Sequence, residues 1–542
     1  MLCGFLFIPA ILLYKLEKKL QKLTLNFVKE NKIVSADYDT TIKSVADENG
    51  ICLASHCGGA GVCGACRVKI LQGSVSDVTQ TEKQFLSEQE LKAGFRLACK
   101  ARVQGDLVIE NSFSENKIKI LDDVLPFRVK ANSKNAFGLG VAVDLGTTSV
   151  VATVFDMADE KLIGRVSFAN PQASFGSDIM SRIASVTNDV ASLRKMQRLL
   201  HNSLYESITG ILCQNDKTKE DITKIVVSGN TVMQHIFVGS SPSSMGSAPY
   251  KPSFLYHSPI HAKEIGLLFA NALIYFVPNI SAFVGGDITS GLTALDFDCK
   301  NKNETALFID LGTNNEMALL ADGQIFATST AAGPAFEGAG ISQGVRAVEG
   351  AICSVSFEKN RLVSHTIGDK RAIGLCGSGM IDCLAVFLEN DIMLQNGSLN
   401  EDNPLVYRNE DGVLQVTLAE EEKVCITQKD IRSLQLVIAS IKAGIKVLFK
   451  RTAKSEESLN KIYLAGAFGN FINIKNARKI GLLPSCNSEV VSAKNTSLFG
   501  AIKALFEDDF LTRARSLSQK VTTINLANEA DFETSFINSL DF

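Results

Sequence analysis

The feature that most constrains the fold is a segment that occurs twice. Residues 141–156 read VAVDLGTTSVVATVFD, and residues 307–322 read LFIDLGTNNEMALLAD. In each copy an apolar run enters a polar turn and a second apolar run leaves it, which predicts a duplicated strand–turn–strand unit. The alignment gives six identities, which are Asp144–Asp310, Leu145–Leu311, Gly146–Gly312, Thr147–Thr313, Ala152–Ala318 and Asp156–Asp322.

The two turns predict a nucleotide-binding site. A glycine lets the backbone approach a ligand closely, and the N–H groups and hydroxyls of such a turn can face phosphates. Asp144 and Asp310 stand at the lip of the turns, where a carboxylate can hold a metal ion or orient a water molecule. Two facing turns would grip one polyphosphate and its cation, and the expected binding residues are Gly146, Thr147, Thr148, Gly312, Thr313 and Asn314.

A third motif, KIYLAGAFGNF over residues 461–471, predicts a strand that runs into Gly466 and Gly469 and leaves room for an adenosine. In this order the three motifs resemble the phosphate-1, phosphate-2 and adenosine elements of the superfamily of actin, sugar kinases, heat-shock chaperone ATPases and acetate kinase. Residues 374–381 (GLCGSGMI), with Gly377, resemble its connecting motif. The resemblance implies ATP with Mg2+ as ligand, and a role at the metal or the attacking water for Asp287.

Four cysteines predict an iron–sulfur cluster. Cys57, Cys63 and Cys66 lie in one glycine-rich loop, and Cys99 follows further on. A structural zinc site made of four cysteines usually has two close pairs, whereas this sequence has a single C-x-x-C pair. The long first gap suits a [2Fe-2S] cluster held by one loop and one distant residue. The spacing resembles ferredoxin β-grasp domains with a five-residue first gap, and Cys52 is expected to be a buried thiol outside the ligand set.

The combination of the two halves resembles the reductive activators of corrinoid proteins. The resemblance covers roughly residues 23–510. Four short motifs carry it: GNTVMQH (229–235), AAGPAFEG (331–338), TQKDIR (427–432) and LAGAFGNF (464–471). It implies an ATP-hydrolysing activase that passes an electron from the [2Fe-2S] cluster to the Co(II) of an inactivated corrinoid protein. The Co(I) so restored serves a methyltransferase system. The resemblance also implies an upstream electron donor and a homodimer.

Two other functions share parts of this pattern. A small-molecule kinase would bind ATP between the same two facing turns, but a kinase activity gives no reason for a fused ferredoxin domain. An ATP-dependent activator of a radical dehydratase would hold a [4Fe–4S] cluster through cysteines inside the ATPase core. The cysteines of the core show no C-x-x-C spacing, so we rank this function below corrinoid activation. These cysteines are Cys213, Cys299, Cys353, Cys376, Cys383, Cys425 and Cys486.

We therefore expect an α+β and α/β multidomain fold, with a β-grasp [2Fe-2S] ferredoxin domain before a duplicated actin-like (ribonuclease H-like) ATPase core. The expected parts are an apolar and basic N-terminal extension (1–22), the ferredoxin domain (23–112), a linker (113–138), the first ATPase lobe with a middle domain (139–302) and the C-terminal lobe (303–535). The extension stops short of a membrane span, and we interpret it as an addition to the family pattern in preference to a membrane anchor.

Composition limits the partners and the compartment. The formal net charge of −3 gives no reason to expect a nucleic acid as partner. The 13 cysteines, an odd number without a secretion signal, favour the reducing cytoplasm. Helices are expected over residues 190–213 and 427–448, the second with Asp430 in a capping pattern. His235 is expected to pack or cap and not to act as an acid or base.

Overall fold

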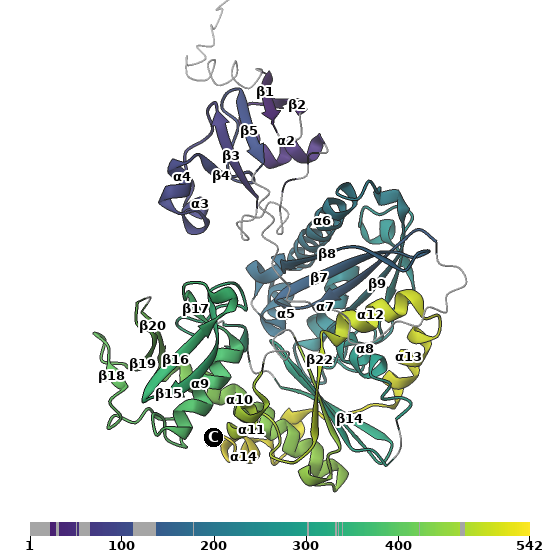
Figure 1. Ribbon diagram of the computed structural model, residues 1–542. Helices are drawn as coiled ribbons and strands as arrows, with labels where there is room; N and C mark the ends of the chain where they lie inside the picture. Colours follow the sequence, from purple (N-terminus) through teal and green to yellow (C-terminus); the bar gives the residue numbers. More distant parts are fainter. Residues whose placement is uncertain are drawn as a thin grey trace, which may run out of the picture.

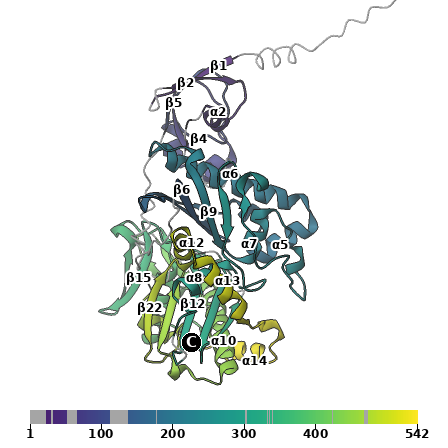
Figure 2. The same cartoon turned by 90° about the vertical axis from the view of Figure 1, so that its right-hand side faces the viewer.

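The structure is a computed structural model that describes residues 22–28, 32–49, 51, 53, 66–111, 137–176, 178–300, 303–330, 333, 335–338, 340–421, 423–466 and 472–542. Figures 1 and 2 show a small N-terminal domain followed by two lobes built on large sheets. None of the helices in these ranges is long and apolar enough to cross a membrane.

The N-terminal domain is a five-stranded sheet with the order β2-β1-β5-β3-β4. Strands β1 and β2 form an antiparallel hairpin, β1 pairs in parallel with β5, and helix α2 follows the hairpin, as in a β-grasp fold. Alternate residues of β1 point into the core, which explains the strand pattern there. The bounds are β1 (Lys22–Phe27), β2 (Lys32–Asp37), α2 (Ile42–Glu48), β3 (Arg67–Gln72), α3 (Gln80–Phe85), α4 (Glu88–Lys92), β4 (Phe95–Leu97) and β5 (Leu107–Asn111).

The two lobes contain the predicted duplication. In the first sheet β6 (Leu139–Leu145), β7 (Ser149–Asp156) and β8 (Lys161–Ala169) are antiparallel, while β9 (Ile222–Gly229) and β11 (Leu273–Phe276) continue the sheet in parallel on the other side of β6. The second sheet repeats this arrangement with β12 (Ala306–Leu311), β13 (Asn315–Ala321), β14 (Gln324–Thr330), β21 (Lys461–Ala465) and β22 (Glu489–Lys494). Short strands β10 (Ile260–His261) and β23 (Thr522–Thr523) lie at the edges.

Helices α8 (Gly286–Ala294) and α12 (Thr496–Phe506) join the two lobes. Helix α12 comes from the C-terminal part of the chain, yet it packs on the first sheet, against Ala142 and Val226. Helix α8 packs on the second sheet, where Leu292 belongs to the same apolar cluster as Phe308. The two helices approach closely, since a Cβ on Gly500 would lie 2.1 Å from Ser290 Oγ. Helices α8 and α12 lie side by side (Figure 1), and the turns that follow β6 and β12 contact each other.

The first lobe also holds α5 (Ile179–Asn188), α6 (Ala191–Cys213), which confirms the predicted helix, and α7 (Thr231–Val238). In the second lobe α10 (Gln428–Thr452) begins with the expected Thr427–Asp430 capping box and runs four residues beyond the predicted end at Leu448. The remaining elements are α9 (Gly377–Glu389), α11 (Ile474–Lys479), α13 (Phe510–Lys520), α14 (Phe532–Ile537), β15 (Ala351–Glu358), β16 (Arg361–Thr366), β17 (Gly374–Leu375), β18 (Val406–Arg408), β19 (Leu414–Ala419) and β20 (Val424–Thr427).

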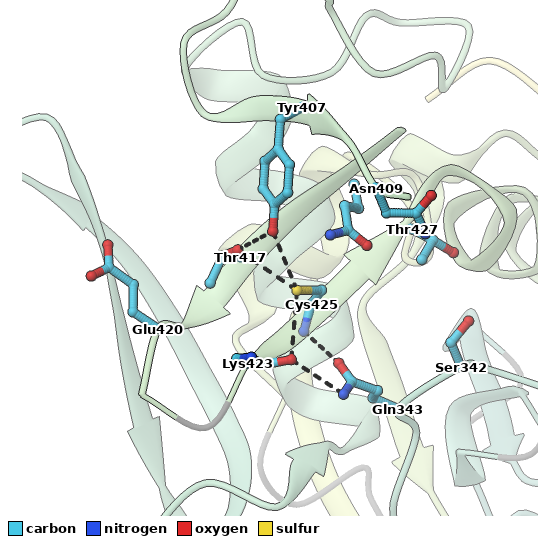
Figure 3. Close-up of a pocket in the computed structure, with 10 residues that line it drawn as sticks. Ser342, Gln343, Tyr407, Asn409, Thr417, Glu420, Lys423, Cys425 and Thr427 are labelled. Carbon is cyan, nitrogen blue, oxygen red and sulfur yellow. Dashed lines mark hydrogen bonds between the residues drawn. The ribbon is translucent and has the colours of Figure 1, made fainter. Parts of the chain in front are cut away.

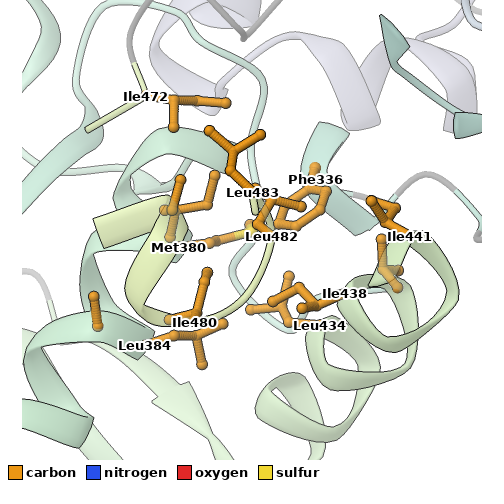
Figure 4. Packing of buried hydrophobic residues seen from close by; sticks show 14 of the residues in the cluster. Phe336, Met380, Leu384, Leu434, Ile438, Ile441, Ile472, Ile480, Leu482 and Leu483 are labelled. Atoms are coloured by element: carbon orange, nitrogen blue, oxygen red, sulfur yellow. The ribbon is translucent and has the colours of Figure 1, made fainter. Parts of the chain in front are cut away.

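The largest apolar core lies in the second lobe. Figure 4 shows α9 and α10 packing through Met380, Leu384, Leu434 and Ile438 with the segment after α11. Fixing α9 against α10 in this way also fixes the N-terminus of α9, where Gly377 stands, relative to the sheet that carries β12.

Candidate nucleotide and cluster sites

The two duplicated turns face each other, and the place where residues 144–149 and 310–315 meet is called the cleft. The Thr148 hydroxyl of the first turn lies 2.7 Å from the Thr313 hydroxyl of the second, although the residues are 165 positions apart. Thr313 also donates to Glu337 (2.8 Å), and the Thr147 hydroxyl accepts from the amide of Asn230 (3.0 Å). The turns between β6 and β7 and between β12 and β13 therefore face each other, as a clamp on one ligand requires.

Asp144, the last residue but one of β6, is held by the start of α12. Asn495 donates its side-chain amide to one carboxylate oxygen (2.8 Å), and the Ser497 hydroxyl donates to the other (2.7 Å). Burial raises the pKa of Asp144, although both hydrogen bonds act against that shift. Asn495 is at the same time the N-cap of α12, so the helix start and the carboxylate orient each other.

Three more carboxylates share the cleft with Asp144. Burial and the charges of Asp287 and Asp144 raise the pKa of Asp310 to about 8. Burial and the charge of Asp144 raise the pKa of Asp287, in the first turn of α8, to about 7. Glu316 of β13 is paired with Asp310 across the hairpin and is 6% exposed, and burial together with Asp287 and Asp310 raises its pKa well above the usual range.

Carboxylates that repel each other in this way suit a divalent cation bound together with phosphates. Within the described residues no three His, Cys, Asp or Glu side chains converge closely enough to form a metal cage by themselves. Mg2+ usually takes only one or two carboxylates and completes its shell with water and phosphate oxygens. The residues therefore fit Mg2+ delivered with ATP better than a metal ion held by protein alone.

Gly466 ends β21 beside Asp310. Strand β21 runs parallel to β12, and Gly466 has a φ of 103°. A Cβ at this position would lie 2.2 Å from the Leu311 carbonyl oxygen and 3.1 Å from an Asp310 carboxylate oxygen. The glycine is thus required by the close approach of the two strand ends. Gly469 lies outside the described residues.

The glycines of the other motifs also stand at turns or helix starts. A Cβ on Gly146 would lie 2.5 Å from the Ser149 carbonyl oxygen, whereas one on Gly312 would meet only the Asn314 carbonyl oxygen at 3.4 Å. Gly377 is the first residue of α9, whose N-terminus is an electropositive end of the kind that binds phosphate. The structure thus gathers Asp144, Asp287 and Asp310 with the facing turns and with Gly466.

Two of the four predicted cluster ligands lie side by side. Cys66 comes just before β3 and Cys99 just after β4, and their sulfur atoms are 3.2 Å apart. That separation is too long for a disulfide bond, which needs about 2.05 Å, and short enough for both sulfurs to bind one iron. Arg96 of β4 forms a buried ion pair with Glu82 (2.8 Å), which anchors the strand that carries Cys99. Cys57, Cys63 and Cys52 lie outside the described residues.

His235 agrees with its expected structural role. It is fully buried, its Nδ1 lies 2.7 Å from the Thr231 carbonyl oxygen, and its Nε2 accepts from the Ser253 N–H (3.1 Å). The ring stacks on Phe254, and burial lowers its pKa to about 4, so it stays neutral. Sequence reasoning missed Glu316, Asn495 and Ser497. The register of the second hairpin, which pairs Asp310 with Glu316, is a signal for Glu316 alone. Asn495 and Ser497 reach Asp144 from a distant segment, which no sequence pattern connects to it.

Two surface pockets lie away from the facing turns. One, of about 580 Å³, is lined by residues of β18, β19 and β20 and by Gln343 (Figure 3), where the Cys425 sulfur lies 3.6 Å from the Thr417 hydroxyl and 3.7 Å from the Tyr407 hydroxyl. The other, of about 550 Å³, lies beside α9 and includes Asp382 and Asn476. Neither contains a residue of the phosphate turns.

Three protein-family profiles match successive parts of the chain. They are described as a 2Fe-2S iron-sulfur cluster binding domain (residues 27–104), the RACo middle region (139–300) and the C-terminal domain of RACo, the ASKHA domain (304–542). The order agrees with a ferredoxin domain before an ATPase core.

Relatives match most of the chain. It is 32% identical over 429 residues to the corrinoid activation enzyme RamQ of Eubacterium limosum, and the alignment covers 76% of this chain and 72% of RamQ. It is 26% identical over 441 residues to the Co(II) methylated amine-specific corrinoid protein reductase of Methanosarcina barkeri, with 74% and 77% covered. A solved structure, described as the reductive activator for corrinoid, iron-sulfur protein, aligns over 96% of this chain and 98% of that chain with a TM-score of 0.70 and 27% identity. The chain therefore belongs to the RACo family.

Proposed function

We propose that this protein uses ATP to drive one electron from its [2Fe-2S] cluster onto the Co(II) of an inactive corrinoid protein, which becomes Co(I). The observation that carries the proposal is the pair of facing turns, joined at Thr148 and Thr313, in the same chain as a β-grasp domain whose Cys66 and Cys99 sulfurs are 3.2 Å apart. The family relationship suggests a corrinoid protein as the electron acceptor, because one relative is named for corrinoid activation and another for the reduction of a corrinoid protein.

The residues divide the work. Cys57, Cys63, Cys66 and Cys99 would hold the cluster, which supplies one-electron chemistry. The facing turns would hold the phosphates, while the carboxylates of Asp144, Asp287 and Asp310 would take the cation and orient the attacking water. Hydrolysis yields ADP and phosphate, and the electron passes separately, so neither reaction needs a covalent link to the other.

ATP is needed because the cobalt is hard to reduce. A one-electron couple shifts by about 59 mV for each tenfold change in equilibrium. Moving a poorly reducible cobalt by roughly 240 mV therefore needs a bias of about ten-thousand-fold, or about 5.5 kcal/mol. Closure of the lobes on ATP can supply that bias if the closed protein binds the reduced and oxidised partner with different affinities.

The test is an anaerobic assay with a chemical reductant and a Co(II) corrinoid protein. The full-length protein with ATP should generate the Co(I) absorption band, and addition of the Co(II) partner should raise ATP turnover. Cobalt reduction that proceeds equally well without ATP would refute the gating role of the nucleotide.

We further propose that the protein acts as a homodimer in the cytoplasm and takes its electron from a separate donor protein. The scattered cysteines favour a reducing compartment, and the family resemblance favours the dimer. Light scattering of the purified protein at a concentration near that in the cell would measure the oligomeric state, and a monomer would contradict the dimer.

A further inference from the structure

The carbonyl groups of the first phosphate turn are held from outside the cleft. Asn170 donates its side-chain amide to the Gly146 carbonyl oxygen (2.8 Å) and its N–H to the Thr148 carbonyl oxygen (2.9 Å). Arg182 donates from Nη2 to the Thr147 carbonyl oxygen (2.7 Å). In a trans peptide the carbonyl and the following N–H point in opposite directions. Holding the carbonyls back therefore turns the N–H groups of the loop toward the cleft.

Arg182 carries a buried charge to this turn. It is 0% exposed and is the largest fully buried side chain in the described chain. Its other donors meet neutral acceptors, the Gly176 carbonyl oxygen (3.0 Å), the Gln172 side-chain oxygen (3.3 Å) and the Met233 sulfur (3.1 Å). Burial lowers its pKa to about 10, which the charge of Asp178 opposes, so the guanidinium remains charged at neutral pH.

Among the described residues no carboxylate forms an ion pair with that charge, and Asp178 acts on it from beyond ion-pair distance. A buried charge without an ion-pair partner is costly, and an anion that arrives nearby offsets part of the cost. The guanidinium contacts the turn at the Thr147 carbonyl oxygen, so an anion bound to the opposite side of the turn would experience the charge across a single peptide.

Helix caps and apolar packing hold the elements around Arg182 together. Helix α5 begins with Asp178 as N-cap in a capping box with Ser181, and its Ile183 shares an apolar cluster with Val232 of α7. Helix α7 in turn begins at Asn230, which donates to the Thr147 hydroxyl. The sequence between the first and second motifs thus builds a support for the turn from three separate segments.

We propose that Arg182 and Asn170 are positioning residues of the nucleotide site, which hold the first phosphate turn with its N–H groups toward the cleft and make it select for the polyphosphate of the nucleotide. The inference rests on the proposed function insofar as this turn binds ATP. Neither residue contacts the nucleotide, and both act through the turn.

The test compares ligands that differ only in phosphate. Affinities for ATP, ADP and adenosine are measured by calorimetry on the full-length, cluster-loaded protein. Arg182→Met should weaken ATP and ADP at least about tenfold while adenosine changes less than about twofold. Arg182→Lys, which keeps the charge with a different donor geometry, should recover part of the loss. The exposed Arg194→Met serves as the matched control and should change none of the three.

Asn170→Ala provides a second variant that leaves the buried charge in place. It should also weaken ATP and ADP but not adenosine, since it frees the Gly146 carbonyl, and it keeps the test decisive if Arg182→Met does not fold. Unchanged ATP affinity in a folded variant, or equal losses for all three ligands, would overturn the inference. Failure of the wild-type protein to bind ATP would instead refute the proposed function.

Discussion

Replacing Asp310 by asparagine tests whether the carboxylates in the cleft destabilise the protein until a cation arrives. The folded-state pKa of Asp310 is raised to about 8 by burial and by the charges of Asp287 and Asp144, against an ordinary value of 3.8. Between these two values the folded protein keeps a proton that the unfolded chain has lost. The resulting stabilisation is fully present below the unfolded pKa and is lost as the pH rises through the folded pKa.

The size of the effect follows from the two pKa values. Raising the pH from 6 to 8 should lower the free energy of unfolding by about 2 kcal/mol through this one group. In a domain of about 200 residues each kcal/mol changes Tm by about 2–4 °C. Over this range Asp310 should therefore lower the Tm of the ATP-free protein by about 4–8 °C. Asp287, with a pKa of about 7, adds a further fall, so the Tm of Asp310→Asn should still decrease with pH, but by less than that of wild type, because an amide does not titrate.

The assay is thermal unfolding of the ATP-free, full-length protein at pH 6 and pH 8. Asp322→Asn is the matched control, since Asp322 lies at the surface in the turn between β13 and β14, where it pairs with Lys454 (2.9 Å). Asp310→Asn should also lose ATP hydrolysis, whereas the control should keep it. An Asp310→Asn protein whose Tm falls by the same amount as wild type between the two pH values would refute the reasoning.

Three further perturbations test the two sites. Mg2+ and ATP binding at pH 7 should release at least about one proton, because Asp310 is about nine-tenths and Asp287 about half protonated in the free protein. Calorimetry in buffers of different ionisation enthalpy measures this release, and fewer than about 0.2 protons would contradict the prediction. Gly466→Val should reduce ATP turnover at least about tenfold at unchanged iron content, since its Cβ would displace the Leu311 carbonyl, whereas Gly412→Ala, which has a similar positive φ but open space around it, should not. The predicted cluster ligands are Cys57, Cys63, Cys66 and Cys99. Replacing any one of them by serine should lower the iron content of the anaerobically purified protein below about two per chain, whereas Cys52→Ser should not. Stoichiometric zinc in the purified protein would contradict the cluster.

The structure gives Gly466 a different role from the one that its motif predicts. From the sequence, this glycine makes room for an adenosine. In the fold a side chain there would first meet the end of β12, at the Leu311 carbonyl and the Asp310 carboxylate. The expected loss of activity is similar, but it would come through a displacement of β12, the strand that carries Asp310.

The sequence by itself determined the features that depend on short-range patterns. Turn residues between apolar runs specify the duplicated hairpins, so Asp144 and Asp310 could be placed at equivalent strand ends. The spacing of the cysteines specified the type of cluster, and the Thr427–Asp430 pattern marked the start of α10. Apart from Cys99, which lies 33 positions beyond Cys66, each of these patterns spans short stretches of chain, where backbone geometry leaves few alternatives.

Tertiary structure alone decided which distant side chains complete the site. Asn495 and Ser497 reach Asp144 from more than 350 positions away, because α12 crosses to pack on the first sheet. Arg182 reaches the Thr147 carbonyl because α5 is fixed by its apolar face. Such contacts depend on how helices pack on sheets through dispersed apolar residues. Because the same amphipathic patterns allow many packings, these polar partners become identifiable only once the fold has brought them together.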